Sequence, residues 1–76
     1  MIHYSKDTAI LGKTLSVELA EELFAWLIAK PNRKVDASKC ESMHTAVLQV
    51  LLLCRPRLTK ASPSVWLQQA LSSLNK

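Results

Sequence analysis

Cys40 and His44 are the residues of this sequence whose types and spacing come closest to a chemical site. On a helix, side chains four positions apart lie on one face, so the pair could form half of a metal site or a nucleophile with its base. A zinc site needs four ligands, and the remaining candidates, His3 and Cys54, are poorly placed to complete one. No motif supplies the oxyanion donors that a cysteine nucleophile needs. We therefore expect a structural or interface role for His44, and no bound metal or cofactor.

The two cysteines are not expected to pair within one chain. If Cys40 and Cys54 lie on one helix, a rise of about 1.5 Å per residue separates them by about 21 Å, far beyond the roughly 7 Å limit for a disulfide. An antiparallel contact between two copies could bring Cys40 of one near Cys54 of the other. In a reducing compartment, free thiols that pack as small apolar side chains are the expected state.

Carboxylates and glycine give no catalytic motif either. Glu18 and Glu22 are four positions apart, where like charges repel slightly, and a general acid and base would need a pocket that gives them different proton affinities. The single glycine, Gly12, excludes a glycine-rich phosphate loop. The sequence therefore predicts a protein that is not an enzyme.

Length and composition predict one small, basic domain. The chain has 76 residues, 49% of them hydrophobic, with a net charge of +4 and a pI of about 9.4. Such a charge would suit a nucleic acid or an acidic protein face as partner. Residues 1–13 lack the features of a signal peptide, and the uncharged run 42–54 is shorter than the roughly 20 residues that span a bilayer. We therefore expect a soluble, cytoplasmic protein with no membrane association.

The first 13 residues are predicted to form a short arm before the main domain. Ile2 and Tyr4 alternate with polar residues, which is the pattern of a strand, whereas Asp7 could instead begin a loose helical turn. The arm could pack over a helix end, cross onto a second subunit, or be a frayed terminus.

Three amphipathic helices are predicted in the domain 14–76, at about 14–30, 37–54 and 63–75. Capping residues precede each of them: Thr14 or Ser16, then Asp36 or a Ser38–Glu41 capping box, then Ser62–Pro63. Pro31 and Pro56 follow the first two, because proline cannot continue a helix. In the third, Trp66 is expected on the packed face with Leu67. Short connections make successive helices antiparallel, so the sequence predicts an all-α fold, a small three-helix bundle that forms a dimer.

The helix predicted at 14–30 has a wider apolar arc than one packed layer needs. Its apolar residues cover more than half of the circumference, whereas a stripe only modestly wider than about 100° is enough to pack on one flat layer. The surplus predicts a contact with another protein. The candidate contact residues are Phe24, Trp26, Ile28 and Leu53. The predicted function is a small, non-enzymatic intracellular regulator or inhibitor, a homodimer that acts by protein–protein interaction on an unidentified protein partner.

Nucleic-acid binding is the alternative prediction, as in a dimeric transcriptional regulator. The candidate residues are the loop cations Arg33, Lys34, Arg55, Arg57 and Lys60. Antiparallel helices would put the first two at one end of the bundle and the other three at the opposite end. A nucleic-acid reader usually concentrates its charge on one face, and neither loop has the short turn of a helix-turn-helix. Cations that only keep the protein in solution are the competing explanation.

Overall fold

The chain has a mixed α/β fold, which the computed structural model describes for residues 1–75. The strands are β1 (Ile2–Ser5), β2 (Thr8–Leu11), β3 (Thr14–Leu15), β4 (Lys34–Asp36), β5 (Ser42–Met43) and β6 (Arg57–Lys60). The helices are α1 (Glu18–Ala29), α2 (Thr45–Cys54), α3 (Val65–Ala70) and the 3-10 helix η1 (Ser72–Asn75). The predicted all-α three-helix bundle is therefore wrong. Lys76, the last residue of the predicted domain, lies outside the described residues.

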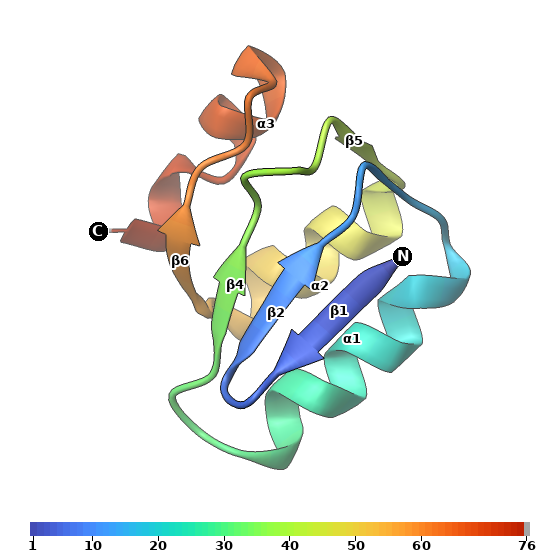
Figure 1. The fold of residues 1–76 in the computed structure, drawn as a ribbon, viewed down its shortest axis with the longest axis vertical. Coiled ribbons are helices and arrows are strands. Elements are labelled where there is room, and N and C mark those ends of the chain that lie inside the picture. Colours follow the sequence, from blue (N-terminus) through green and yellow to red (C-terminus); the bar gives the residue numbers. More distant parts are fainter. Residues whose placement is uncertain (76) are drawn as a thin grey trace.

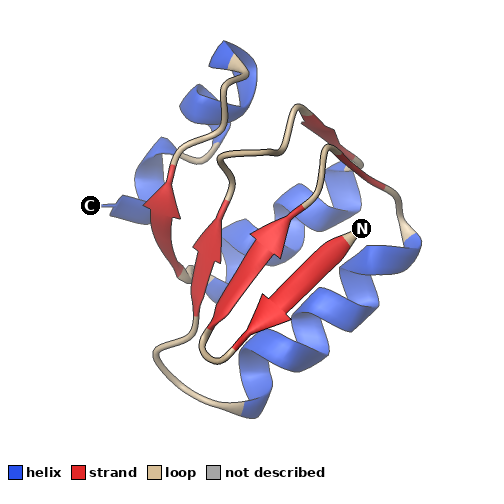
Figure 2. Cartoon of the chain, in the orientation of Figure 1, coloured by secondary structure: helices blue, strands red, loops and turns tan. Residues whose placement is uncertain are grey.

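Four of the strands form one mixed sheet in the order β1-β2-β4-β6. β1 and β2 are an antiparallel hairpin, whereas β2, β4 and β6 are parallel to one another. Parallel neighbours need a crossover connection, and α1 and α2 provide the two crossovers. Both helices cover the same face of the sheet, and the opposite face is open (Figure 1). η1 contacts β6 at one edge, and β3 pairs with β5 in a small parallel sheet of its own (Figure 2).

The predicted N-terminal arm is a β-hairpin. Ile2 is buried and Tyr4 is half-buried, while the residues between and after them are exposed, so the period of two belongs to a strand with one packed face. The turn to β2 is tight, and Lys6 adopts a positive φ of 47° within it. Of the alternatives for the arm, the strand is the one that the chain adopts.

The core lies between the sheet and the two helices that cover it. Val35 is the one buried residue of β4, and Leu58 is the one buried residue of β6. From the helices, Leu23, Val47 and Leu51 are fully buried against them. Burying a side chain of this size contributes about 1.5–3 kcal/mol. Strands of three or four residues are therefore held in place by packing against the helices.

The first predicted helix, 14–30, begins later in the structure, because its first two residues are β3. α1 ends at Ala29. Lys30 is extended there, with φ −145° and ψ 145°. It precedes Pro31, whose ring disfavours helical geometry in the residue before it.

The second predicted helix, 37–54, is reduced to α2, because a turn and β5 take up its first residues. The backbone N–H of Ser38 donates to Oδ1 of Asp36 at 2.9 Å, in a turn after β4 rather than at a helix start. The residue that caps α2 is His44, whose Nδ1 accepts a hydrogen bond from the N–H of Ala46 at 3.0 Å. The predicted capping box is therefore wrong.

The third predicted helix, 63–75, is α3 followed by η1. Ser64 caps α3, and its Oγ accepts a hydrogen bond from the N–H of Leu67 at 3.4 Å. Ser62 is buried instead, and its hydroxyl donates to the carbonyl of Cys40. This bond ties the segment after β6 to the segment after β4.

Candidate functional site

The basic residues of two separate loops lie together at one end of the sheet. β2, β4 and β6 are parallel, so α1 and α2 both run back along the sheet in the opposite direction. Both helices therefore finish at the end of the sheet where β4 and β6 begin (Figure 1). Arg33 and Lys34 follow α1, Arg55 and Arg57 follow α2, and all four line one pocket together with Lys30. We call it the basic pole pocket. The expectation that the two loops lie at opposite ends is wrong, because it rested on antiparallel helices.

The basic pole pocket has a volume of about 500 Å³. Besides its five cationic residues it is lined by apolar side chains that include Leu27 and Cys54, and no acidic residue of the described chain lines it. Lys60, the remaining nucleic-acid candidate, lies at the far end of β6, in register with Asp36. The structure thus brings together four of the five predicted nucleic-acid residues.

Arg33 is held in a defined orientation in this pocket. Its Nη1 donates a hydrogen bond to the carbonyl of Trp26 at 2.6 Å, and its guanidinium carbon lies 4.3 Å from the centroid of the Trp26 ring. Its Nε is buried and has no hydrogen-bond partner within residues 1–75. The stacked guanidinium is therefore positioned while part of its hydrogen-bonding capacity is unused.

Arg55 is also fixed by the fold. It ends α2 in the left-handed conformation, with φ 51° and ψ 52°, and its N–H donates to the carbonyl of Leu51 at 2.9 Å. Its Nη2 donates to the carbonyl of Ser73 at 3.0 Å, beyond the edge of the sheet. A left-handed residue followed by proline is a common way to end a helix, so the backbone here has a structural role of its own.

Lys34 and Arg57 are the first residues of β4 and β6, and they are paired in register across the parallel ladder. Both are exposed. Within residues 1–75, no side-chain hydrogen bond engages Lys30, Lys34 or Arg57, whereas Arg33 and Arg55 each have one. Three of the five cations in the pocket are therefore without a partner in the described chain.

A second candidate surface lies on the helix layer, on the side away from the sheet. Phe24, Ile28 and Leu53, three of the four predicted contact residues, are 37%, 62% and 74% exposed. We call these three residues the outer apolar face. The fourth, Trp26, is only partly exposed, because it packs with Arg33 and with Tyr4 inside the fold.

Helix geometry explains why these three residues share a face. α1 packs against α2, and the flank of α1 that carries Trp26 faces β1 through Tyr4, with 5.0 Å between the ring centroids. Residues are about 100° apart around a helix, so Phe24 and Ile28 lie on the other flank, which borders α2. α2 runs parallel to α1, and the same spacing puts Leu53 on the flank of α2 that borders α1. The outer apolar face therefore follows the seam between the two helices.

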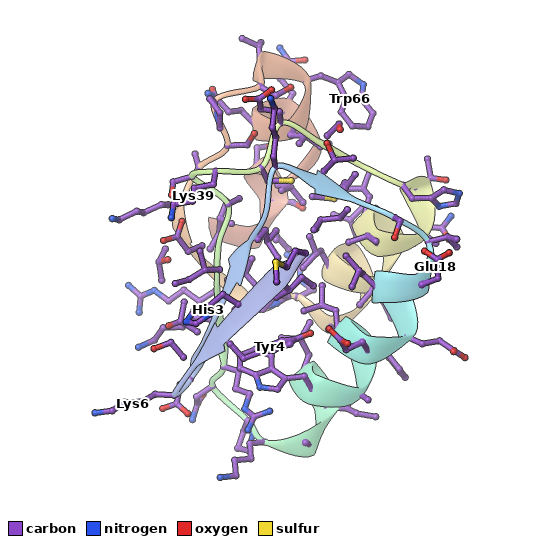
Figure 3. All side chains as sticks on the ribbon, turned by 45° about the vertical axis from the view of Figure 1, so that its right-hand side comes forward. His3, Tyr4, Lys6, Glu18, Lys39 and Trp66 are labelled. Atoms are coloured by element: carbon purple, nitrogen blue, oxygen red, sulfur yellow. The ribbon has the colours of Figure 1, made fainter. Side chains whose placement is uncertain are left out.

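Tyr4 fixes the opposite flank of α1 to the hairpin. Its hydroxyl donates a hydrogen bond to Oε2 of Glu22 at 2.8 Å. Burial raises the pKa of Tyr4, and the hydrogen bond to Glu22 and the charge of Glu22 raise it further. The hydroxyl therefore remains a hydrogen-bond donor at neutral pH, and Figure 3 shows Tyr4 over the helix side of the sheet.

Trp66 is exposed, although the helical pattern of residues 63–75 predicts it on a packed face. It is 57% exposed and its neighbour Val65 is 67% exposed, whereas Leu67 is fully buried. Figure 3 shows the indole of Trp66 standing away from the body of the protein. The signal was present in the sequence, because three consecutive apolar residues on a helix cannot all face one side.

The thiols and His44 do not form a reactive site. Cys40 lies in the segment after β4 rather than on a helix, and its Sγ donates to the carbonyl of Ser42 at 3.4 Å. Cys40 and Cys54 are both free thiols, and burial raises the pKa of each, which disfavours the reactive thiolate. His44 caps α2. Across residues 1–75, no three His, Cys, Asp or Glu side chains are grouped so as to hold a metal ion.

Comparison with known proteins assigns neither a family nor a function to the chain. No protein family, curated protein or solved structure matches the chain. In the part of the chain that the structure describes, no helix has both the length and the apolar run that crossing a bilayer requires. The basic pole pocket and the outer apolar face are the two candidate binding surfaces of the described chain.

Proposed function

We propose that the protein is a small, non-enzymatic regulator or inhibitor that acts by protein–protein interaction as a homodimer, and that the outer apolar face forms the contact between the two copies. The observation that carries this proposal is the exposure of Phe24, Ile28 and Leu53 along the seam between α1 and α2. Isolated apolar residues are ordinary on a protein surface. A group of large apolar side chains on one face instead favours a contact with a partner.

A second copy of the chain is the partner that we propose first. α1 has opposite charges at its two ends, because Glu18 and Glu21 lie in its first turn and Lys30 follows its last residue. In a twofold-symmetric dimer, two α1 helices can pair antiparallel with Phe24 near the axis. This pairing puts the acidic end of each helix beside Lys30 of the other copy. It also covers the outer apolar face of both copies.

Sedimentation velocity on variants of the outer apolar face tests the proposal. Wild-type protein is expected to sediment as a dimer at about 10–100 μM, and dissociation constants in this range correspond to a binding free energy of roughly 5.5–7 kcal/mol. The double variant Ile28→Glu with Leu53→Glu should sediment as a monomer and keep its helical circular dichroism. The matched control is Val65→Glu with Trp66→Glu, which introduces the same charges at two other exposed apolar positions and should leave the dimer intact.

Two results would contradict the homodimer: a monomeric wild type across the whole range, or equal dissociation by both double variants. Loss of the helical signal in the first variant would show that Ile28 and Leu53 maintain the fold rather than a contact. The regulatory role itself is tested by pull-down from the native host. A captured protein should be lost with the first double variant and kept with the control.

A further inference from the structure

The basic pole pocket has the size of a site for a small molecule. Its volume of about 500 Å³ lies inside the roughly 300–1,000 Å³ range that is typical of ligand sites. Leu27 and Cys54 are apolar residues of its lining, and five cationic residues line the same pocket. Such a combination suits an anion whose negative charges lie close together and whose other atoms can contact apolar side chains.

The charges of the pocket are not explained by the fold alone. Cations at a helix end can stabilise the helix dipole, which accounts for Lys30 and Arg55, the residues directly after α1 and α2. Lys34 and Arg57 are strand residues instead, and they oppose each other in register. Like charges directly opposite each other on neighbouring strands destabilise a sheet. An anion bound between them would relieve this repulsion.

Acidic side chains of the protein do not fill this role. Asp36 is two residues from Lys34 in β4 and does not line the pocket, and the backbone carbonyl of Asp7 accepts the N–H of Lys34 at 2.6 Å. Asp7 does not line the pocket. Arg33 adds a positioned guanidinium with a buried, unpartnered Nε, and guanidinium groups match the geometry of phosphate oxygens.

We propose that the basic pole pocket binds a small anion that carries two or more phosphate groups. The three cations without a partner, Lys30, Lys34 and Arg57, balance a ligand of several negative charges, and Arg33 presents a stacked donor to it. A nucleic-acid strand is the less suitable ligand, because its backbone needs cations spaced along a groove or face. Here five cations from the two segments that follow α1 and α2 line one pocket. The outer apolar face does not line the pocket, and Lys30 is the one residue that the pocket shares with the proposed dimer contact.

Isothermal titration with sodium tripolyphosphate tests the proposal on the full chain at about 50 mM salt, where phosphate contacts are little screened. Wild type is expected to bind, and Lys34→Gln with Arg57→Gln should bind at least about tenfold more weakly, a change of roughly 1.4 kcal/mol. The matched control is Lys13→Gln with Lys39→Gln, which removes the same net charge from exposed positions outside the pocket. The control should change the affinity less than about twofold, because its charges act only through the screened field of the whole protein.

Further probes separate the possible sources of the phosphate groups. Adenosine triphosphate should bind at the same site, and adenosine alone should not. Absence of tripolyphosphate binding, or equal weakening by both double variants, would overturn the proposal. So would tighter binding of a DNA oligonucleotide than of tripolyphosphate with a log–log salt slope steeper than about −3, because several backbone phosphate contacts would then define a nucleic-acid site.

Alkylation of Cys54 in the wild type gives a readout that needs no substitution. Cys54 lines the pocket, whereas Cys40 is fully buried elsewhere and serves as the internal reference. Tripolyphosphate should slow the alkylation of Cys54 several-fold and leave Cys40 unchanged. Unchanged alkylation of Cys54 at saturating tripolyphosphate would place the anion outside the pocket and overturn the proposal.

Discussion

Lys34 and Arg57 face each other in register at the start of the parallel strands β4 and β6. Both side chains are exposed, and each strand has a single buried residue directly after this pair, Val35 in β4 and Leu58 in β6. The two cations are therefore brought together by the packing of their neighbours. Like charges in this arrangement oppose strand pairing, and both residues line the basic pole pocket, so we attribute the pair to the anion binding proposed above.

Replacing one member of the pair should stabilise the free protein. Arg57→Gln is expected to raise the free energy of unfolding by about 0.2–1 kcal/mol in low salt, because it removes a like-charge cross-strand pair. The gain should shrink at about 0.5 M salt, where charges are screened within a few ångströms. Urea unfolding at the two salt concentrations measures this gain. Destabilisation of the variant in low salt would show that Arg57 supports the fold.

His44 is expected to contribute to stability as the cap of α2. His44→Ala should lower the free energy of unfolding by about 0.5–2 kcal/mol, since the N–H of Ala46 loses its acceptor. His44→Asp should restore most of the loss, because aspartate is a strong N-cap residue and its charge favours the helix N-terminus. Thermal unfolding of the three proteins gives the comparison. Equal stability of the alanine variant and the wild type would rule out the capping role.

Asp36 makes stability depend on pH. Burial raises the pKa of Asp36, but the hydrogen bonds from Ser38 and the charges of Lys60 and Lys39 outweigh burial, and the pKa is lowered overall. A carboxyl group whose pKa is lowered by folding stabilises the protein above its unfolded pKa, about 4, and loses this contribution as the pH falls through the folded value.

Asp36→Asn should therefore be less stable than the wild type at pH 7. The difference should be below about 1 kcal/mol because water screens the partly exposed carboxylate. It should begin to decrease as the pH falls below about 4, the ordinary aspartate pKa, and should vanish only at a pH below the lowered folded value. Urea unfolding across this pH range measures the difference. A gap between the two proteins that widens on acidification would contradict a pKa of Asp36 that folding lowers.

Some of the fold could be predicted from the sequence, namely the positions where a residue and its immediate neighbours determine the backbone conformation. Pro31 and Pro56 each follow shortly after a helix end in the structure, because a proline ring acts on its immediate neighbours regardless of the fold. The alternation of Ile2 and Tyr4 with polar residues is local in the same way, and it belongs to a strand.

The sheet itself could not be predicted, because its central signals are too short. β4 and β6 each contain one buried residue: Val35 stands between Lys34 and Asp36, and Leu58 between Arg57 and Thr59. One buried residue is too few to establish a period of two. Residues 14–15 look like the start of a helix and become β3 only through pairing with β5. Without β4 and β6, the sequence predicts that the first two helices follow each other directly and pack antiparallel in a bundle. The basic loops are then separated, although the structure joins them in one pocket.

Cross-linking at Phe24 tests the central claim, that the outer apolar face binds a second copy of the chain. In a Cys54→Ser background, Phe24→Cys is expected to form a covalent dimer rapidly on mild oxidation, because the twofold pairing of α1 brings the two introduced thiols within the roughly 7 Å that a disulfide allows between Cα atoms. Lys39→Cys in the same background is the exposed control and should remain monomeric under the same conditions. Cross-linking of Phe24→Cys that is no faster than that of Lys39→Cys would contradict the claim.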